Sequence, residues 1–486
     1  MHARLLTWFV APLVAGGVVL AAGDDRRLAD AAKRQDPQAL RALLDARADV
    51  NGRHADGSTA LHWAAHWNDL QATTLLIRAG ADVNAANDFG VTPLSLACTN
   101  GSLPVAQALL DRRANPNAAL ATGETPLMTA AFTGNAALVD ALLAHGANAD
   151  AKESSQGQTA LMWAVSEKHH TVAAALVRHG ADLAARSKSG FTPLLFAARV
   201  NNLDAIQLLL AAGADINQTS TDGSTALLVA TVRGHLAAAK MLLEKGADPN
   251  AAGRGFTALH WAAGSWETEL TGPRGIATDR EEEWKGLRGL EGDKLELVKT
   301  LLAHGANPNA RLAKPPPRVG FTVFVVNLNG ATPFFLAAMA SDAAVMRSLT
   351  EAGADPTLST QGKMTPLMAA AGVGRVLAES RSTEAGTVDA VKAAWALGAD
   401  DVNAVNAAGD TALHGAAHVR SDEVVRFLAE KGADLNVKNK RGETPLMVSE
   451  RSIAAGSEPV FQRTSTGDLL RQLGARDEPR PERSKP

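Results

Sequence analysis

The chain has 486 residues, of which 46% are hydrophobic but only 4% are aromatic, and it contains no Tyr. A length several times that of a typical domain indicates either several globular domains or one repeat array, and a core poor in aromatic rings favours closely packed helices of small residues. The formal net charge of -3 at pH 7 argues against a protein that binds nucleic acid through an overall basic surface.

The amino terminus has the pattern of a secretory signal peptide. A positively charged start is followed by an apolar run over residues 5–22 and by small residues before Asp24. We therefore expect residues 1–23 to be a signal peptide and the mature protein to be periplasmic or secreted. A signal anchor is the alternative, because the apolar run approaches the length that spans a bilayer. Cys98 is the only Cys, so the exported chain forms no internal disulfide.

The chain from about residue 24 to 475 is a tandem repeat. A Thr followed by Ala or Pro and then by Leu or Phe recurs about every 33 residues, with two longer intervals of 75 and 46 residues after Thr257 and Thr365. Insertions explain both long intervals. The repeated residues are Thr59, Thr92, Thr125, Thr159, Thr192, Thr225, Thr257, Thr332, Thr365, Thr411 and Thr444.

Each repeat predicts two helices. The Thr is placed to cap the first helix, and a following Pro suits the first helical position, where the missing N–H costs nothing. A second apolar stripe at helical spacing follows, as in residues 203–211, and Gly213 ends it by adopting a left-handed backbone conformation. Arg47 and Arg113 replace this Gly in two repeats, so we expect those two turns to be strained.

These residues resemble the ankyrin repeat. The resemblance is carried by GSTALHWAA from Gly57, GVTPLSLAC from Gly90 and GDTALHGAA from Gly409, with downstream elements of the type LL…GADxN, and it covers nearly everything from Leu28 to Ala475. It implies an all-α repeat solenoid, an ankyrin-repeat array of about twelve helix-turn-helix units with short β-hairpin connections.

The resemblance also implies a structural role for one His position. The family's His after the conserved Leu is kept only as His62, His260 and His414. In the family this His bonds back to the start of its helix, so the other repeats should replace the bond by apolar packing.

Both ends of the array are predicted to be caps. In the first repeat, Asp36 is placed to cap a second helix that begins at Pro37. The run TGDLLRQLGA from Thr466 closes the array, and residues 476–486 are so polar and Pro-rich that we expect a disordered tail.

Three enlargements interrupt the second half of the array, near residues 264–293, 311–330 and 372–386. The first and third fall between the two helices of a repeat, so they should emerge at the edge opposite the hairpins. The second lengthens a hairpin and contains VFVV, a plausible extra strand. Long insertions in compact repeats are often functional, so we expect an accessory subdomain that forms or borders a binding site.

The sequence carries no complete catalytic, metal or cofactor motif, so we expect no enzyme activity, no metal and no cofactor. His62 and His66 have a spacing that can hold zinc, but HWAAH lacks the Glu of HExxH, and His62 occupies the structural position of the repeat. We expect Cys98 to be a buried core residue and the run EEEW at 281–284 to be a solvated face.

The aromatic residues divide by their place in the repeat. Trp63, Trp163, Trp261 and Trp395 are expected in the core, whereas aromatic residues near a helix end or within the insertions are candidates for partner contact. Together with two arginines of the third enlargement, the candidate partner-binding residues are Trp67, Phe132, Trp266, Trp284, Phe321, Phe324, Arg375 and Arg381.

These observations predict a monomeric, non-enzymatic scaffold that binds another protein outside the cytoplasm. They predict no nucleic-acid partner, and a membrane association only if residues 1–23 are retained. The alternative is a small-ligand or catalytic site that the inserted loops build from Glu267, Glu269, Glu379 and Glu384 with Arg375 or Arg381.

Overall fold

The computed structural model describes residues 26–264, 294–315, 327–375, 382–452 and 460–477. Within these segments 24 helices form twelve consecutive pairs, one pair for each predicted repeat. The chain divides into two compact units, an N-terminal unit that ends at Ser155 and a C-terminal unit that begins at Gln156. The prediction of an all-α repeat solenoid with about twelve helix-turn-helix repeats is confirmed.

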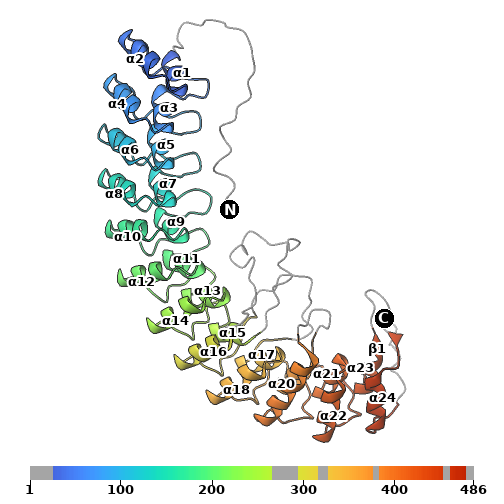
Figure 1. The fold of residues 1–486 in the computed structure, drawn as a ribbon. Coiled ribbons are helices and arrows are strands. Elements are labelled where there is room, and N and C mark those ends of the chain that lie inside the picture. Colours follow the sequence, from blue (N-terminus) through green and yellow to red (C-terminus); the bar gives the residue numbers. More distant parts are fainter. Residues whose placement is uncertain (1–25, 265–293, 316–326, 376–381, 453–459, 478–486) are drawn as a thin grey trace. The chain divides into compact units, whose positions relative to one another are not determined.

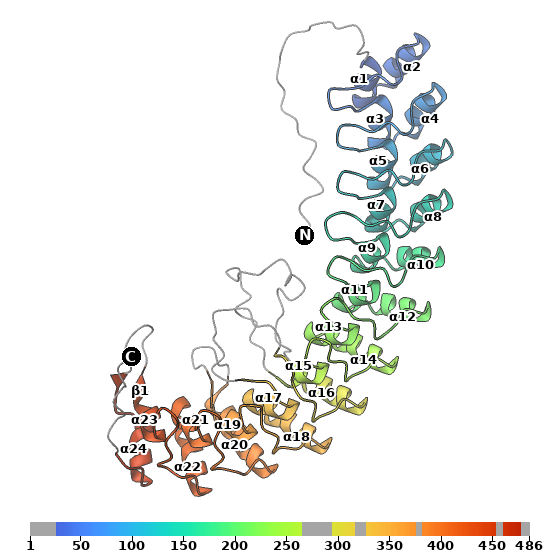
Figure 2. The same ribbon diagram turned by 180° about the vertical axis from the view of Figure 1, so that it is seen from behind.

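The N-terminal unit contains four repeats. In Figures 1 and 2 the first helices of the repeats lie in one row and the second helices in a parallel row. The first helices are α1 (Arg27–Lys33), α3 (Ala60–His66), α5 (Pro93–Thr99) and α7 (Pro126–Thr133), and the second helices are α2 (Pro37–Asp45), α4 (Leu70–Arg78), α6 (Leu103–Leu110) and α8 (Ala136–Ala144).

The C-terminal unit contains eight repeats in the same arrangement. Its first helices are α9 (Ala160–Ser166), α11 (Pro193–Arg199), α13 (Ala226–Val232), α15 (Ala258–Ala263), α17 (Pro333–Met339), α19 (Pro366–Ala370), α21 (Ala412–Val419) and α23 (Pro445–Glu450). Its second helices are α10 (His170–Arg178), α12 (Leu203–Ala211), α14 (Leu236–Glu244), α16 (Lys294–Ala303), α18 (Ala343–Glu351), α20 (Glu384–Ala396), α22 (Asp422–Glu430) and α24 (Ser465–Gln472).

The residues predicted to begin and end the helices do so in the structure. The Thr92 hydroxyl accepts a hydrogen bond from the backbone N–H of Ser95, and the Asp36 carboxylate accepts two at the start of α2. Gly213 has a φ of 95°, in the left-handed region. Arg47 and Arg113 hold the corresponding positions with φ of 55° and 63°, which confirms that these two turns force a side chain into a conformation that glycine adopts more easily.

The core is built from Ala, Leu and Val at the contacts between successive repeats. Trp63 and Trp261 are buried as predicted, whereas Trp163 and Trp395 are only half-buried. Cys98 is fully buried in α5, and burial raises the pKa of its thiol, so its predicted role as a small core residue is confirmed. No helix in the described segments has both the length and the apolar character needed to cross a membrane. The predicted signal peptide lies outside the described residues.

The connections between repeats differ from the β-hairpins that the sequence predicted. They are turns, and the described connections contain only one isolated bridge, between Arg53 and Thr59. Asn side chains join them, together with single backbone hydrogen bonds such as that from the Asp88 N–H to the Asp56 carbonyl. In the N-terminal unit the Asn51 side-chain oxygen accepts a hydrogen bond from the backbone N–H of Asp82 at 2.8 Å, and Asn84 bonds to the N–H of Asn115 in the same way. A side chain thus supplies the cross-repeat bond that a strand pairing would give.

The same Asn contacts run through the C-terminal unit except at two positions, where the chain has Ala184 and Thr357 instead of Asn. Asn217 accepts from the N–H of Asp248 at 2.9 Å, and Asn250 accepts from that of Asn307 at 2.7 Å. At the corresponding position between α10 and α11 the chain has Ala184, whose side chain accepts no hydrogen bond. This connection therefore lacks the Asn contact, although the Lys188 N–H still donates to the Gln156 carbonyl of the connection before it.

Three insertions separate the two helices of a repeat, all in the C-terminal unit. Most of the first, between α15 and α16, lies outside the described residues, as does the VFVV run of the enlarged hairpin. The second, between α19 and α20, ends earlier than predicted, because α20 begins at Glu384 rather than after residue 386. The third, residues 451–464 between α23 and α24, was missed by sequence reasoning. It contains the antiparallel strands β1 (Arg451–Ser452) and β2 (Val460–Phe461).

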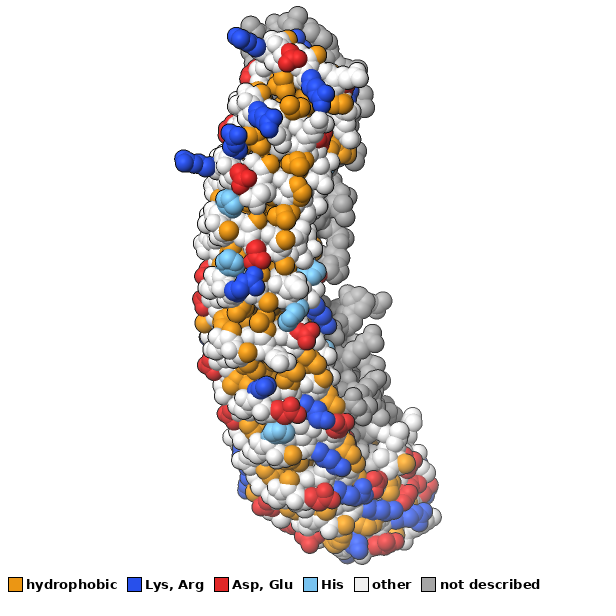
Figure 3. Space-filling view, turned by 60° about the vertical axis from the view of Figure 1, so that its left-hand side comes forward, with side chains coloured by type: hydrophobic (Ala, Val, Ile, Leu, Met, Phe, Trp, Pro, Cys, Tyr) orange, Lys and Arg blue, Asp and Glu red, His pale blue; other side chains and the backbone are white. Residues whose placement is uncertain are grey.

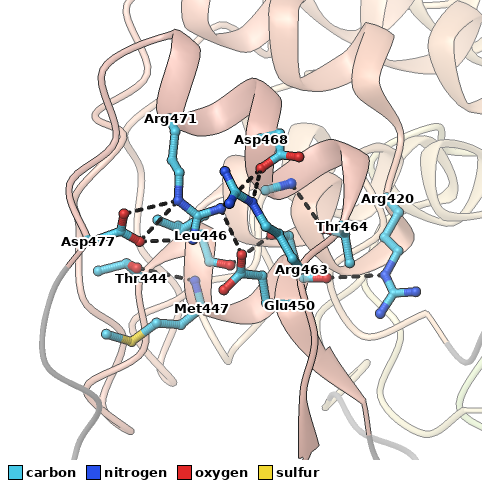
Figure 4. Close-up of polar contacts among 12 residues, drawn as sticks. Arg420, Thr444, Leu446, Met447, Glu450, Arg463, Thr464, Asp468, Arg471 and Asp477 are labelled. Carbon is cyan, nitrogen blue, oxygen red and sulfur yellow. Dashed lines mark hydrogen bonds and ion pairs between the residues drawn. The ribbon is translucent and has the colours of Figure 1, made fainter.

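Ion pairs hold the last helix across the third insertion (Figure 4). Arg471 of α24 pairs with Glu450 at the end of α23 at 2.8 Å, and also with Asp468 and Asp477. Asp477 and, after it, Glu450 raise the pKa of the Arg471 guanidinium through their hydrogen bonds. Figure 3 shows charged side chains of both signs gathered at the lower end of the view. The final repeat is therefore capped by charge as well as by apolar packing.

Candidate functional site

Trp67 is a large apolar side chain that is both exposed and fixed in place. It follows α3, and 43% of its surface is accessible to solvent. Its indole Nε1–H donates a hydrogen bond to the carbonyl oxygen of Lys33 at 3.2 Å. The His66 ring contacts the indole edge to face, with the ring centroids 4.7 Å apart.

Trp67 belongs to a cluster of side chains from α1, α3 and the connection that precedes α3, which we call the Trp67 cluster: Lys33, His54, Trp63, His66 and Trp67. The Lys33 ammonium lies 4.8 Å from the centre of the Trp63 ring. The Trp63 ring in turn contacts His54 and His66 edge to face. Burial lowers the pKa of His66, so its imidazole is neutral at pH 7.

The repeat period explains why the cluster lies on one face. Lys33, His66, Thr99 and Phe132 follow each other at 33-residue steps, near the ends of α1, α3, α5 and α7. Because successive first helices pack side by side, these positions form a row along the N-terminal unit (Figure 1). Trp67 directly follows the row residue His66, and the half-buried Phe132 is the row residue two repeats further on, so both predicted partner-binding residues lie at the same end of the first helices.

Phe89 is an exposed aromatic residue that sequence reasoning did not select. It lies in the turn between α4 and α5 and is 63% exposed, more than any other large apolar side chain of the described residues. Its N–H donates to the Asn87 side chain at 3.0 Å, which fixes the turn. The available signal was the run NDFG, where an apolar ring stands among polar turn residues.

Arg375 is the third predicted site residue that the structure describes. It lies between α19 and α20 and is half-buried. Its guanidinium donates to the hydroxyl oxygens of Ser341 and Thr387, each at 2.8 Å, and to the carbonyl oxygen of Ala370 at 3.4 Å. Burial lowers the pKa of this guanidinium.

The remaining predicted site residues either lie outside the described residues or make other contacts. Trp266, Trp284, Phe321, Phe324 and Arg381 lie outside the described residues, as do Glu267, Glu269 and Glu379. Glu384 is exposed, and its carboxylate accepts a hydrogen bond from Ser421 at 3.5 Å instead of pairing with Arg375. Of the alternative carboxylate–arginine site, the two described residues, Glu384 and Arg375, therefore do not pair with each other.

The three retained His residues join one repeat to the next. The backbone N–H of Thr59 donates to His62 Nδ1 at 3.1 Å, so Nε2 carries the proton and donates to the Val91 carbonyl at 2.9 Å. His260 and His414 make the same pair of contacts, with Ala310 and Glu443 as the carbonyl acceptors. Desolvation is the main cause that lowers the pKa of all three, for His260 to about 4.

These hydrogen bonds show that the HWAAH run does not bind zinc through His62. Both ring nitrogens of His62 are occupied by structural hydrogen bonds, so the ring has no lone pair left for zinc. Across the segments that the structure describes, no group of three or more His, Cys, Asp or Glu residues is placed to hold a metal ion. The structural reading of His62 is confirmed.

Comparisons with known proteins match this architecture. The family model for ankyrin repeats (3 copies) matches residues 28–119, 113–187, 157–220, 194–270 and 380–461. The human neurogenic locus notch homolog protein 1 is 33% identical over 142 residues, which cover 25% of this chain and 6% of that protein. A putative ankyrin repeat protein of Rickettsia bellii is 48% identical over 46 residues, which cover 10% of this chain and 27% of that protein.

Among solved structures, the crystal structure of the human ASB11 ankyrin repeat domain is 27% identical, with a TM-score of 0.41, and the match covers 46% of this chain and 98% of that one. The chain spans well under two thirds of the two sequence relatives, so their whole-protein activities do not transfer to it. The family model, in contrast, accounts for more than half of the chain. The chain belongs to the ankyrin-repeat family, whose repeats generally mediate protein–protein interactions and whose members are typically non-enzymatic scaffolds.

Proposed function

We propose that this chain is a monomeric, non-enzymatic scaffold that binds another protein through the first-helix ends of its N-terminal unit, with Trp67 as the main anchor. The observation that carries the proposal is that the Trp67 ring is 43% exposed and yet held by a hydrogen bond to Lys33. Rigid, exposed Trp side chains are the residues that most often dominate binding energy at protein interfaces.

The surroundings of Trp67 suit such an anchor. Lys33 and His66 fix its position, so a partner that covers the ring does not have to immobilise it first. Phe132 lies at the same end of its first helix two repeats further on. A partner with an apolar pocket for the indole and a surface that follows the row would bury both aromatic rings.

The test is capture of partners from the native host by wild-type and variant chains, with the captured proteins quantified by mass spectrometry. Trp67→Ala should weaken capture of a specific partner about thirtyfold, because an anchor of this kind contributes about 2 kcal/mol or more. Leu473→Ala, which shortens an exposed apolar side chain of the C-terminal unit, is the matched control and should change nothing. Unchanged capture by the Trp67 variant would contradict the proposal.

We also propose that the insertions contribute to partner binding through Trp266, Trp284, Phe321, Phe324 and Arg381. The support is the sequence pattern, in which aromatic residues stand outside the repeat in three clustered enlargements. Replacement of residues 265–293 by a short turn should leave helical content intact, because repeats contact mainly their neighbours, while partner capture falls. Full capture by the shortened chain would place the binding surface elsewhere.

We further propose that the protein is exported, on the strength of the charged and apolar pattern of residues 1–23. Mass spectrometry of the protein from its native host should then find a mature amino terminus near Asp24. Recovery of the soluble full-length chain from the cytoplasm would contradict export.

A further inference from the structure

The turns between the two helices of repeats two, three and four form one edge of the N-terminal unit. We call this surface the turn edge; it comprises residues 66–71, 99–104 and 132–137. Asn100 Nδ2 donates a hydrogen bond to the His66 carbonyl oxygen at 2.7 Å, and Asn135 Nδ2 donates to the Gly101 carbonyl oxygen at 2.8 Å. Since α3, α5 and α7 also lie in one row (Figure 1), the turn edge is continuous and its turns are fixed relative to one another.

The turn edge carries almost no charge. Asp69 is the only Asp, Glu, Lys or Arg in its three turns, and the Asp69 carboxylate caps α4 by accepting from the Ala72 N–H at 2.9 Å. His66 is neutral at pH 7, because burial lowers its pKa. The corresponding turns of repeats five, six and seven all contain charged residues, namely Glu167, Lys168, Arg199, Asp204 and Arg233. The low charge is thus a property of the turn edge and not of the repeat itself.

Apolar side chains are exposed along the turn edge. Leu70, the first residue of α4, is 44% exposed, and Trp67 beside it is 43% exposed. Pro104 in the first turn of α6 is exposed as well, and Phe132 and Ala136 of repeat four are half-buried. Each of the three repeats therefore offers apolar surface to a partner.

Positive charge bounds the turn edge on the side of repeat one. Lys33 and Arg34 are both exposed in the corresponding turn of that repeat. The Asp36 carboxylate of the same turn caps α2, and Asp30 pairs with His54 at 3.4 Å. A partner that follows the turn edge toward repeat one therefore meets two cations, and the complementary charge at that end of the partner is negative.

The geometry of the turn edge fits an α-helix better than an extended segment. The backbone N–H groups of Asn68 and Asp69 donate to the carbonyl oxygens of Ala65 and Ala64, so this turn offers no strand edge for an added strand. Successive repeats lie about 10 Å apart. Seven residues of an α-helix rise by about the same 10 Å. One face of a helix can therefore contact repeats two, three and four in turn.

We propose that the turn edge binds an amphipathic α-helix of the partner protein, whose apolar residues recur at three- and four-residue spacing and whose Asp or Glu residues lie at the end beside Lys33 and Arg34. The inference rests on the proposed protein-binding function and specifies the kind of segment that Trp67 anchors. A lipid surface fits less well, because Thr99 and Thr133 expose polar side chains between the apolar ones.

The first test selects helix-length peptides of random sequence by phage display on the full chain and measures their affinities by fluorescence anisotropy. The enriched peptides should carry the apolar spacing and the terminal carboxylates described above. Leu70→Lys and Pro104→Lys place a charge on the turn edge and should each lower the affinity at least about tenfold. Failure to recover any such peptide, or equal affinities of the wild type and both variants, would overturn the proposal.

The matched control is Phe89→Lys, which places the same charge on a side chain that is 63% exposed in a connection of the same unit. It should change the affinity of the peptides less than about twofold, because the connections lie outside the turn edge. A larger loss of affinity in Phe89→Lys than in Leu70→Lys would assign the peptides to the connections and overturn the proposal.

Two changes test the conformation and the direction of the bound peptide. A Pro in the middle of the peptide breaks a helix and should abolish binding. Unchanged binding would indicate an extended segment and overturn the proposal. Arg34→Glu should weaken binding about two- to fivefold, the size of an exposed ion pair, and a Lys in place of the terminal Glu of the peptide should restore it. No response to either charge change would overturn the assignment of the acidic end.

Two further arms separate this inference from a lipid surface and from the proposed function. Cosedimentation with vesicles of phosphatidylglycerol and phosphatidylethanolamine should be the same for the wild type and Leu70→Lys, and a loss in the variant would assign the turn edge to a membrane and overturn the proposal. Capture of the native partner should fall in both Trp67→Ala and Leu70→Lys. A loss in Trp67→Ala alone would overturn the docked helix and leave the proposed function intact.

Discussion

Within the C-terminal unit, regular repeats and repeats that carry insertions are joined differently. Around α11–α14 the contacts between repeats are apolar packing of the first helices and Asn contacts such as that of Asn217 with the Asp248 N–H. At the other end of the first helices His235 donates to the Arg199 carbonyl in these regular repeats, whereas around α19–α24 the contacts there are those of His418, a residue of α21 itself, with the Arg375 carbonyl and of Arg471 with Glu450. An insertion is thus accommodated partly by residue changes in the repeat that follows it.

The largest expected effect concerns His260, in the repeat that carries the first insertion. Burial lowers its folded-state pKa to about 4 from the usual 6.5, so its contribution to stability is full above pH 6.5 and is lost as the pH falls from 6.5 to 4. The loss at the low end is about 3 kcal/mol. Denaturant unfolding at several pH values measures it.

The matched control for His260 is taken from the regular repeat before it. His260→Leu copies Leu228, the residue at the same position of α13. The variant should lose the hydrogen bond to Ala310 but show a flatter pH dependence between 6.5 and 4. A pH dependence identical to that of the wild type would show that other groups are responsible.

The next effect concerns Gly415 in α21. Most other repeats have Leu, Trp, Phe or Val at this position, and Ala favours helix over Gly by about 1 kcal/mol. A Cβ atom here would nevertheless lie 2.6 Å from the Val373 nitrogen and 3.0 Å from the Ala371 oxygen. Gly415→Ala should therefore lower the free energy of unfolding by about 2 kcal/mol, as measured by denaturant titration. A gain in stability would mean that the turn before Arg375 yields freely.

The Arg471 ion pairs at the end of the chain provide a smaller effect. Glu450 has only 9% of its side chain exposed, so Glu450→Gln leaves the Arg471 guanidinium without its most buried partner and should cost about 1–2 kcal/mol. Hydrogen exchange should show the loss mainly in α24. Asp468→Asn, at a side chain that is 44% exposed, is the control and should cost less than about 0.5 kcal/mol. Equal losses in both variants would contradict a special role for Glu450.

Two opposite substitutions in the turns after the second helices test the cost of the left-handed backbone conformation. A Cβ atom on Gly213 would meet no atom within 4 Å, so Gly213→Ala tests the backbone alone and should cost about 1 kcal/mol through its φ of 95°. Arg113→Gly should gain about 0.5–1 kcal/mol for the same reason. Thermal unfolding of the two variants checks both signs, and a loss of stability in the Arg113 variant would show that its side chain makes a compensating contact.

The smallest expected effect restores a missing contact in the regular repeats. Ala184→Asn supplies a side-chain oxygen at the position where Asn217 accepts from the next repeat, and should gain about 0.5 kcal/mol in denaturant unfolding. Asn217→Ala should cost a similar amount. No change in either variant would mean that solvent satisfies these backbone N–H groups equally well.

Sequence reasoning predicted what depends on local pattern. The number of repeats, the Thr caps, the left-handed Gly and Arg positions and the buried Trp63 and Cys98 all follow from residues within one repeat. It missed what depends on contact between repeats. Gly415 is explained only by the turn of the repeat before it, and Glu384 contacts Ser421 of the next repeat, which the pattern of its own repeat does not indicate. The third insertion was missed because insertions were found from the spacing between the Thr residues of successive first helices, and no such Thr follows Thr444 in the series.

Cys98 can report local unfolding of the N-terminal unit, because its thiol is buried in the folded state. The thiol is fully buried in α5, and its raised pKa leaves almost no thiolate in the folded state, so an alkylating reagent can modify it only after the N-terminal unit opens. Because it is the only thiol, the labelling rate reports one site without any engineering. The substitutions at His260, Gly415, Glu450, Gly213 and Ala184 all lie in the C-terminal unit. Their effect on Cys98 labelling therefore measures how far a local loss of stability spreads along the array.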